Sequence, residues 1–170
     1  VMADLSKRWP TQVNAAAFYG DPCGRNAQAS PKWERQNLAL IPCPWPLVTA
    51  WNGGTVKSLR IHRHCAESLS AVLDAIWKAA AGDLEIVRAW GMHLYGGGYY
   101  FRPARGESWL SMHAYGCAVD FDPARNGWKN PRPNFASVPA VLEAFAAEGW
   151  IWGGSWAKKD GMHWQAARTK

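Results

Sequence analysis

The stretch from Arg60 to Ala81 has the strongest periodic pattern in the chain. Its apolar side chains recur at steps of three and four residues, as on one face of an α-helix. Polar residues fill the opposite face, and Gly82 is a typical helix terminator. The apolar positions are Ile61, Cys65, Leu69, Val72, Leu73, Ile76, Trp77 and Ala80. We therefore predict a helix from about residue 60 to residue 81.

Shorter patterns predict further elements. A short helix is expected at Ala15–Tyr19, closed by Gly20, and a second helix at about 138–148, with Ser137 as its N-cap and Gly149 as its terminator. Alternating or short apolar runs predict strands. These strands are Leu38–Ile41, ended by Pro42, Pro44 and Pro46, then Leu84–Trp90, Cys117–Asp122, Trp150–Trp152 and Met162–Gln165.

Together these elements predict an α+β fold, with a small antiparallel sheet and helices packed on one side. The chain has 170 residues, which suits a single domain. Residues 1–57 are rich in Pro, Gly, Asn and Trp and show little periodicity, so we expect them to form a loop-rich wrap. Residues 58–170 are expected to form the core of the same domain.

Composition narrows the class of partner. Hydrophobic residues make up 48% and charged residues 19%, which describes an ordinary globular protein. The net charge of +6 favours an anionic partner. Because Lys and Arg are scattered and form no recognised binding motif, nucleic acid is disfavoured as that partner. The 12 tryptophans indicate either core packing or an aromatic groove for a sugar-peptide polymer.

The cysteines and two histidines indicate structural roles. Four cysteines form no C-x-x-C pair, which argues against a zinc ribbon. We expect reduced thiols, with Cys65 and Cys117 buried, although a bridge between Cys23 and Cys43 stays open. His62 and His64 are two positions apart on the expected helix, so they would point in nearly opposite directions and lie on the surface. No apolar run is long enough to cross a membrane, and the N-terminus lacks a signal-peptide pattern.

The residues with the most specific chemistry are His113, Asp120 and His163. Two histidines and an aspartate are a ligand set that zinc takes in hydrolytic sites, with a fourth position for water. Gly116 can turn the chain before the strand that carries Asp120, which would bring His113 over the strand end. By itself a His and an Asp seven positions apart is a common pattern, so its specificity depends on the later segment around His163.

The two segments resemble the signature of the M15 metallopeptidases, which include D-Ala-D-Ala carboxypeptidases, VanX/VanY-type dipeptidases and phage L-alanyl-D-glutamate endolysins. The matching patterns are Ser111-x-His113-x-x-Gly116-x-Ala118-x-Asp120 and Asp160-x-x-His163-Trp164. The runs Gly96–Gly106 and Trp150–Trp156 are also similar to segments of phage-type members, so the resemblance covers roughly residues 85–166. Gln165 departs from it, because many members carry an acidic residue there. The implied fold is that of hedgehog and D-Ala-D-Ala peptidases.

The resemblance implies one zinc ion per chain, held by His113, Asp120 and His163. It also implies that Asp160 is the catalytic acid–base, although an aspartate in a Lys-Asp-Gly sequence is also typical of a turn. Arg102 is the candidate for stabilising the oxyanion, with Arg105 as the alternative. Either arginine could instead bind a substrate carboxylate.

Four further polar residues are considered for a role at the site. Ser111 and Tyr115 are expected to orient ligands or substrate, and Ser111 is disfavoured as a nucleophile because it sits in no nucleophile elbow. His93 follows a predicted strand and is a candidate substrate contact, although a lone histidine is more often structural. Asp122 is expected to be a surface or turn residue.

The resemblance therefore implies a monomeric zinc peptidase that cuts the stem peptide of bacterial peptidoglycan. An L-Ala-D-Glu endolysin is favoured, made in the host cytoplasm without a signal peptide and acting at the bacterial cell wall or periplasm. The alternatives are a D,D-carboxypeptidase or dipeptidase that trims terminal D-Ala, a hedgehog-like binding module that keeps zinc, and a basic nucleic-acid binder. Which bond is cut and whether a wall-binding domain accompanies this chain are left open.

Overall fold

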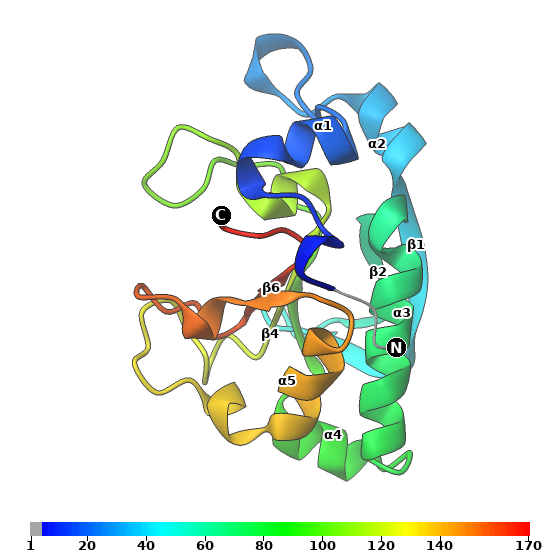
Figure 1. Cartoon of the computed structure of the whole chain (residues 1–170). Helices are drawn as coiled ribbons and strands as arrows, with labels where there is room; N and C mark the ends of the chain where they lie inside the picture. Colours follow the sequence, from blue (N-terminus) through cyan, green and yellow to red (C-terminus); the bar gives the residue numbers. More distant parts are fainter. Residues whose placement is uncertain (1–4) are drawn as a thin grey trace.

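The computed structural model describes residues 5–170 as a six-stranded sheet with helices beside it (Figure 1). The strands are β1 (Leu38–Thr49), β2 (Thr55–His62), β3 (Leu94–Gly97), β4 (Ala118–Phe121), β5 (Ile151–Trp152) and β6 (His163–Gln165). Their order in the sheet is β2-β1-β3-β4-β6-β5. Neighbours are antiparallel except β1 and β3, which are parallel. The predicted α+β class is confirmed.

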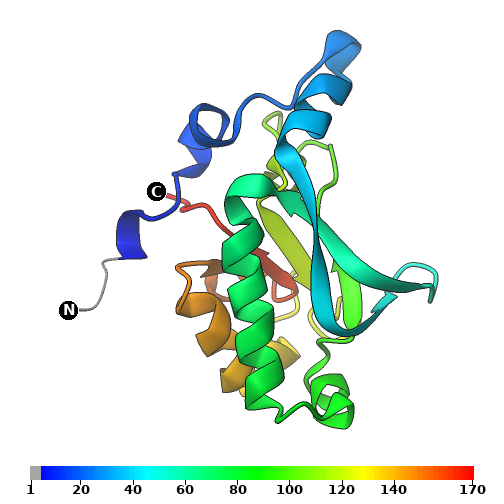
Figure 2. The same cartoon turned by 90° about the vertical axis from the view of Figure 1, so that its right-hand side faces the viewer.

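The α-helices are α1 (Ala15–Tyr19), α2 (Pro31–Asn37), α3 (Arg63–Ala79), α4 (Leu84–Trp90) and α5 (Pro139–Ala146). Short 3₁₀ turns occur at Leu5–Lys7, Gln12–Asn14, Arg25–Ala27, Met112–Tyr115, Asn134–Ser137 and Gly153–Ser155. In Figure 2, α3 and α5 lie on the same side of the sheet. None of the helices in residues 5–170 is long and apolar enough to cross a membrane.

The long predicted helix is present as α3, but it begins later than expected. Residues 60–62 belong to β2 instead, and the apolar pattern runs on through the strand end because Ile61 is buried there too. The buried face of α3 contains Cys65, Leu69, Val72, Leu73 and Ile76, as the periodicity predicted. Burial of one Leu or Ile side chain stabilises the fold by roughly 1.5–3 kcal/mol, so this face anchors the helix to the sheet.

The strand prediction at Leu84–Trp90 was wrong, because this segment is the helix α4. The Asp83 side chain accepts a hydrogen bond from the Glu85 N–H at 2.9 Å and caps the first turn. Gly91 ends the helix in the left-handed conformation, with φ of 87°. These two helix-boundary residues outweigh an alternation of apolar and polar residues that is too short to be decisive.

The expected end of the first strand at residue 41 was also wrong. β1 continues through Pro42, Pro44 and Pro46 to Thr49, and its register with β2 shifts between Pro42 and Leu47. Proline cannot donate to a ladder and is tolerated at such irregularities. Residues 38–49 thus supply a strand inside the sheet, and the expected division at residue 57 falls within β2.

The expected ends of the two shorter helices were confirmed for one helix and corrected for the other. The helix Ala15–Tyr19 and its Gly20 end are confirmed. The second helix is α5, but Ser137 is not its N-cap, because Ser137 ends a 3₁₀ turn and Val138 precedes the helix without a side-chain cap.

The four cysteines are free thiols, so Cys23 and Cys43 are not bridged, and Cys65 and Cys117 are buried as predicted.

The N-terminal segment runs beside the end of the chain, and Figure 2 shows the two on the same side of the molecule. Gln12 N–H donates to the Arg168 carbonyl at 2.8 Å, and Arg168 N–H donates to the Pro10 carbonyl at 2.7 Å. The Tyr19 hydroxyl donates to the Ala166 carbonyl at 2.6 Å. Residues 10–19 are therefore fastened to the segment that directly follows β6.

His62 is buried, which corrects its expected surface position; His64 is exposed as expected. His62 lies before the helix, so the opposed directions expected for two helical positions do not apply, and the two rings lie 4.7 Å apart. Its Nδ1 accepts from the His64 N–H at 3.0 Å, and its Nε2 lies 2.9 Å from the Tyr19 carbonyl, to which it donates. The contact at Nδ1 requires the neutral ring, because a protonated Nδ1 cannot accept a hydrogen bond, whereas Nε2 can donate in either state.

Stability is expected to fall as pH decreases from about 6.5 to about 4 because of His62. Burial lowers the pKa of His62 to about 4, and the positive charges of His64 and Arg63 act in the same direction. The unfolded histidine takes up a proton near pH 6.5, so stability present above that pH is lost as the pH falls toward 4. The loss is on the order of 2 kcal/mol. It is measured as the free energy of unfolding in urea across this range.

The matched variants are His62→Gln and His64→Gln. Glutamine at position 62 does not titrate, so His62→Gln should flatten this part of the pH dependence. His64→Gln changes an exposed ring and should keep most of it. An unchanged pH dependence in His62→Gln would contradict the prediction.

Candidate metal centre

Three side chains from separate parts of the chain converge at one end of the sheet. His113 comes from the 3₁₀ turn Met112–Tyr115, Asp120 from β4 and His163 from the start of β6. Asp120 and His163 are direct partners in the β4–β6 ladder. His163 Nδ1 lies 3.1 Å from Asp120 Oδ1 and 3.2 Å from His113 Nε2, and His113 Nε2 lies 3.2 Å from Asp120 Oδ2. The three residues predicted as ligands are thus brought together.

The hydrogen bonds on the far side of each ring define which nitrogens face the centre of the group. His113 Nδ1 lies 2.7 Å from the Gly98 carbonyl, and His163 Nε2 lies 2.8 Å from Gln165 Oε1. Both oxygens are acceptors, so these ring nitrogens carry the hydrogens when the rings are neutral. The nitrogens that face each other therefore present lone pairs. Two lone pairs and a carboxylate that converge on one point form a site for a cation.

The donor set fits zinc. Its ligand atoms all lie within 4.8 Å of one another. Ligands at zinc's usual 2.0–2.2 Å in tetrahedral geometry are about 3.3 Å apart, close to the spacing of these side chains. Burial alone would raise the pKa of Asp120, but His113 and His163 hold this pKa well below its usual range, so the carboxylate is charged. Three protein ligands leave a fourth position open, as catalytic zinc sites require.

Local sequence explains how His113 reaches this position. The Ser111 side chain accepts a hydrogen bond from the His113 N–H at 3.2 Å and caps the 3₁₀ turn. Gly116 then reverses the chain with φ of 69°, in the left-handed region. A Cβ at Gly116 would lie 2.8 Å from the Leu38 side chain and 3.0 Å from the His62 backbone nitrogen. The expected turn at Gly116 is confirmed, and close packing also requires glycine.

The loop before the motif holds His113 from the other side. Gly98 supplies the carbonyl that His113 Nδ1 contacts, and Tyr100 N–H donates to the His113 carbonyl at 3.1 Å. A Cβ at Gly98 would lie 2.6 Å from the Tyr95 hydroxyl and 2.7 Å from the Arg60 carbonyl. Glycine thus lets the loop approach closely enough to orient the ring.

Asp160 faces the same cavity as His113 and His163. Its backbone is fixed by a bridge to Trp128 and by an N–H bond to the Gly153 carbonyl at 2.9 Å. Among the described residues, its buried Oδ1 has no hydrogen-bond partner. Burial raises the pKa of Asp160, although the nearby His163 opposes this shift. A carboxylate that lines the cavity beside a cation site stands where a general base is needed.

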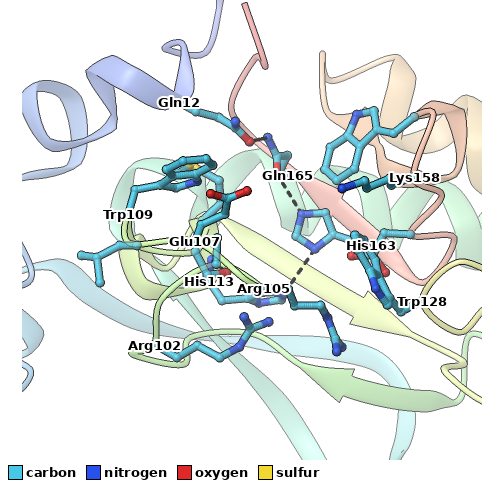
Figure 3. A pocket seen from close by; sticks show the side chains of 16 residues that line it. Gln12, Arg102, Arg105, Glu107, Trp109, His113, Trp128, Lys158, His163 and Gln165 are labelled. Carbon is cyan, nitrogen blue, oxygen red and sulfur yellow. Dashed lines mark hydrogen bonds between the residues drawn. The ribbon is translucent and has the colours of Figure 1, made fainter.

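Two cavities flank the metal group, and His113, Arg102 and Arg105 line both. We call the first the tryptophan side; its aromatic lining is Trp109, Trp128 and Trp156. We call the second the tyrosine side; its aromatic lining is Trp51, Tyr95, Tyr99 and Tyr100. Figure 3 shows the arginines below His113 and His163, with Trp109 and Trp128 on either side. These shared residues border both cavities, which we together call the cleft, so open space adjoins the metal group on two sides.

The remaining candidates lie at different distances from this cleft. Arg102 donates to the Pro103 carbonyl at 3.0 Å, and Arg105 lies over the Trp128 ring at 5.5 Å. Ser111 lines the tryptophan side as well as capping the turn. Tyr115 is half-buried and lines neither side. His93 also lies outside both.

Asp122 was expected to be a surface or turn residue; the surface position was wrong, whereas its carbonyl accepts from the Asn126 N–H at 3.1 Å across a turn. Its side chain is fully buried and bonded to Arg125 Nε at 2.6 Å. It follows β4 directly, with φ of 47°. Alternation along a strand indicates which residues share a face, but it does not reveal a buried ion pair formed just after the strand ends.

Several residues of the site were missed in the sequence. Gln12 and Lys158 line the tryptophan side, and Gly98 supplies the carbonyl beside His113. Gln165, which stands where many members carry an acidic residue, contacts His163, with its Oε1 2.8 Å from His163 Nε2. Nothing in the spacing around Gln12 pointed to the site, because its approach depends on pairing with residue 168.

The geometry of this site is that of a candidate metal centre with a carboxylate, Asp160, lining the same cavity. Residues 104–166 match the M15 family model described as D-alanyl-D-alanine carboxypeptidase. This segment contains His113, Asp120, Asp160 and His163, so the match supports the resemblance to the M15 family over the part of the chain that carries the metal group. No curated protein and no solved structure gives a significant match. The family match supports a peptidase of peptidoglycan in general.

Proposed function

We propose that this chain is a zinc-dependent endopeptidase that hydrolyses an amide bond within the peptidoglycan stem peptide. The observation that carries the proposal is that a cavity adjoins the metal group on each of two sides. An endopeptidase must hold substrate on both sides of the scissile bond, whereas a carboxypeptidase needs room for one terminal residue on the leaving side. The active unit is proposed to be the monomer, because one chain supplies the whole cleft, and its place of action the bacterial cell wall.

The L-Ala-D-Glu bond suits the charges around the cleft. The D-Glu residue next to this bond has a free α-carboxylate, because the stem continues through its side chain. Arg102, Arg105 and Lys158 line the tryptophan side and can pair with such a carboxylate. The mixture of cations and aromatic rings also fits an anionic sugar-peptide polymer.

In the proposed reaction, a zinc ion held by His113, Asp120 and His163 would polarise the scissile carbonyl and lower the pKa of a water molecule to about 7. Asp160 takes the proton from the attacking water and passes it to the leaving amine. Arg102, with Arg105 as the alternative, stabilises the negative charge that develops on the carbonyl oxygen. The stacking of Arg105 on Trp128 restricts its side chain near the cleft.

A D,D-carboxypeptidase or dipeptidase is the second candidate. The description of the matching family model favours it, and the same arginines could bind a terminal carboxylate. A hedgehog-like module that keeps zinc without catalysis is less favoured, because Asp160 retains a carboxylate that lines the cavity beside the metal group. These candidates differ in what they release from peptidoglycan.

Digestion of purified peptidoglycan should separate the candidates. The expected result is a new N-terminal D-Glu on released stem fragments, detected by mass spectrometry, and its loss when a chelator is present. Release of free D-Ala alone would establish the carboxypeptidase instead. If the zinc-loaded protein left the peptidoglycan intact, the result would support the non-catalytic binding module.

A further inference from the structure

A buried chain of hydrogen bonds links the metal group to the N-terminal segment. His163 Nε2 donates to Gln165 Oε1 at 2.8 Å. Gln165 Nε2 donates to the Ala167 carbonyl and to Gln12 Oε1, each at 2.9 Å. Figure 3 shows Gln12, Gln165 and His163 in line at the edge of the cleft. Gln12 lies far from the matched family segment in sequence.

We propose that Gln12 is a positioning residue of the metal centre and acts on His163 through Gln165. This inference rests on the proposed zinc site. It assigns residues 10–19 a part in building that site, beyond covering the core.

The orientation of the Gln165 amide carries the first step. Two oxygens, from Ala167 and Gln12, face its nitrogen. If the amide rotated by half a turn, its oxygen would meet the Ala167 carbonyl, which has no hydrogen to donate. Gln165 is buried, so water cannot relieve this repulsion. The amide oxygen therefore points at His163.

The second step concerns the His163 ring. Because Gln165 Oε1 is an acceptor, it stabilises the hydrogen on Nε2 and leaves the lone pair on Nδ1, the nitrogen that faces Asp120 and His113. A partner of this kind fixes both the tautomer and the orientation of a metal-ligating histidine. An amide suits position 165 better than a carboxylate, because it can accept from His163 and donate to two oxygens at once.

The third step concerns how Gln12 is held. Thr11 forms a bridge with Arg168, and Gln12 N–H donates to the Arg168 carbonyl at 2.8 Å. The backbone at residue 12 is thus fixed against the segment that follows β6. Gln12 Oε1 is consequently supplied at a set position, and its loss would leave one hydrogen of the buried Gln165 amide without its acceptor.

The test compares zinc affinity in four variants by competition with a chromogenic chelator. Gln165→Leu should weaken zinc binding by about 10–100-fold, and Gln12→Leu should weaken it by about 3–10-fold. Gln12→Glu keeps an acceptor for Gln165 Nε2 and should retain at least the parent affinity. Val13→Ala changes an exposed neighbour (89% exposed) and should leave affinity unchanged. The visible absorption of the cobalt-substituted proteins should change in Gln12→Leu and Gln165→Leu alone.

Thermal unfolding of the metal-free variants separates positioning from a structural role. Equal melting temperatures for metal-free Gln12→Leu and Val13→Ala, with weaker zinc binding in Gln12→Leu, would support the proposal. It would be overturned by parent-like zinc affinity in Gln12→Leu, or by a lower melting temperature of that variant without metal. A parent protein that binds no zinc would instead contradict the proposed function.

Discussion

Replacing His163 by alanine is expected to abolish zinc binding and peptidoglycan hydrolysis together. His163 Nδ1 faces Asp120 and His113 at 3.1 and 3.2 Å, so its removal takes away one of three ligands. Parent protein purified without added metal should contain close to one zinc per chain by elemental analysis. His163→Ala should contain almost none.

The same substitution should remove the stabilisation that zinc gives to the fold. The ion would tie the 3₁₀ turn that carries His113 to β4 and β6, and a ligand that binds only the folded state raises its stability. Chelator should therefore lower the melting temperature of the parent and leave that of His163→Ala unchanged. His64→Ala, at an exposed histidine, is the control and should behave like the parent. Full zinc content in His163→Ala would contradict the ligand assignment.

The metal group was predictable because its geometry depends on local features. Asp120 and His163 lie on strands that pair directly, and Gly116 provides the turn that places His113 over them. Each of these features leaves a mark in sequence: a short strand, a glycine and two motifs at fixed spacing. The buried face of α3 was predictable for the same reason, because its buried side chains recur with the period of an α-helix.

Errors arose where two patterns fitted the same residues. Leu84–Trp90 satisfies an alternating pattern, and only Asp83 and Gly91 identify it as the helix α4. Residues 42–46 contain prolines that normally end strands, yet the strand continues through an irregular register. In both segments the deciding contacts are capping or cross-strand interactions that a periodicity search does not weigh.

Contacts between distant segments could not be inferred from spacing. The buried position of His62 depends on Tyr19, whose carbonyl lies 2.9 Å from His62 Nε2. Gln12 reaches the metal group because its backbone pairs with residue 168. Such contacts form only after the whole chain has folded, so they define the part of the site that the motifs leave out.

Asp160→Asn is expected to lower the rate of hydrolysis by about 10²–10⁴-fold while zinc and fold are retained. The substitution is nearly isosteric, and Asp160 is not one of the three residues that form the metal group. Its side chain faces the same cavity as His113 and His163, with one buried oxygen free of partners among the described residues. An amide cannot accept a proton from the attacking water, so the step loses its base.

The loss should appear in kcat, with KM for wall peptide almost unchanged, because ground-state contacts remain. Zinc content and melting temperature should match the parent. Asp74→Asn makes the same chemical change at an exposed position of α3 and should hydrolyse at the parent rate. If fully metallated Asp160→Asn also hydrolysed wall peptide at the parent rate, Asp160 would be a turn residue. Another group facing the cleft would then have to accept the proton.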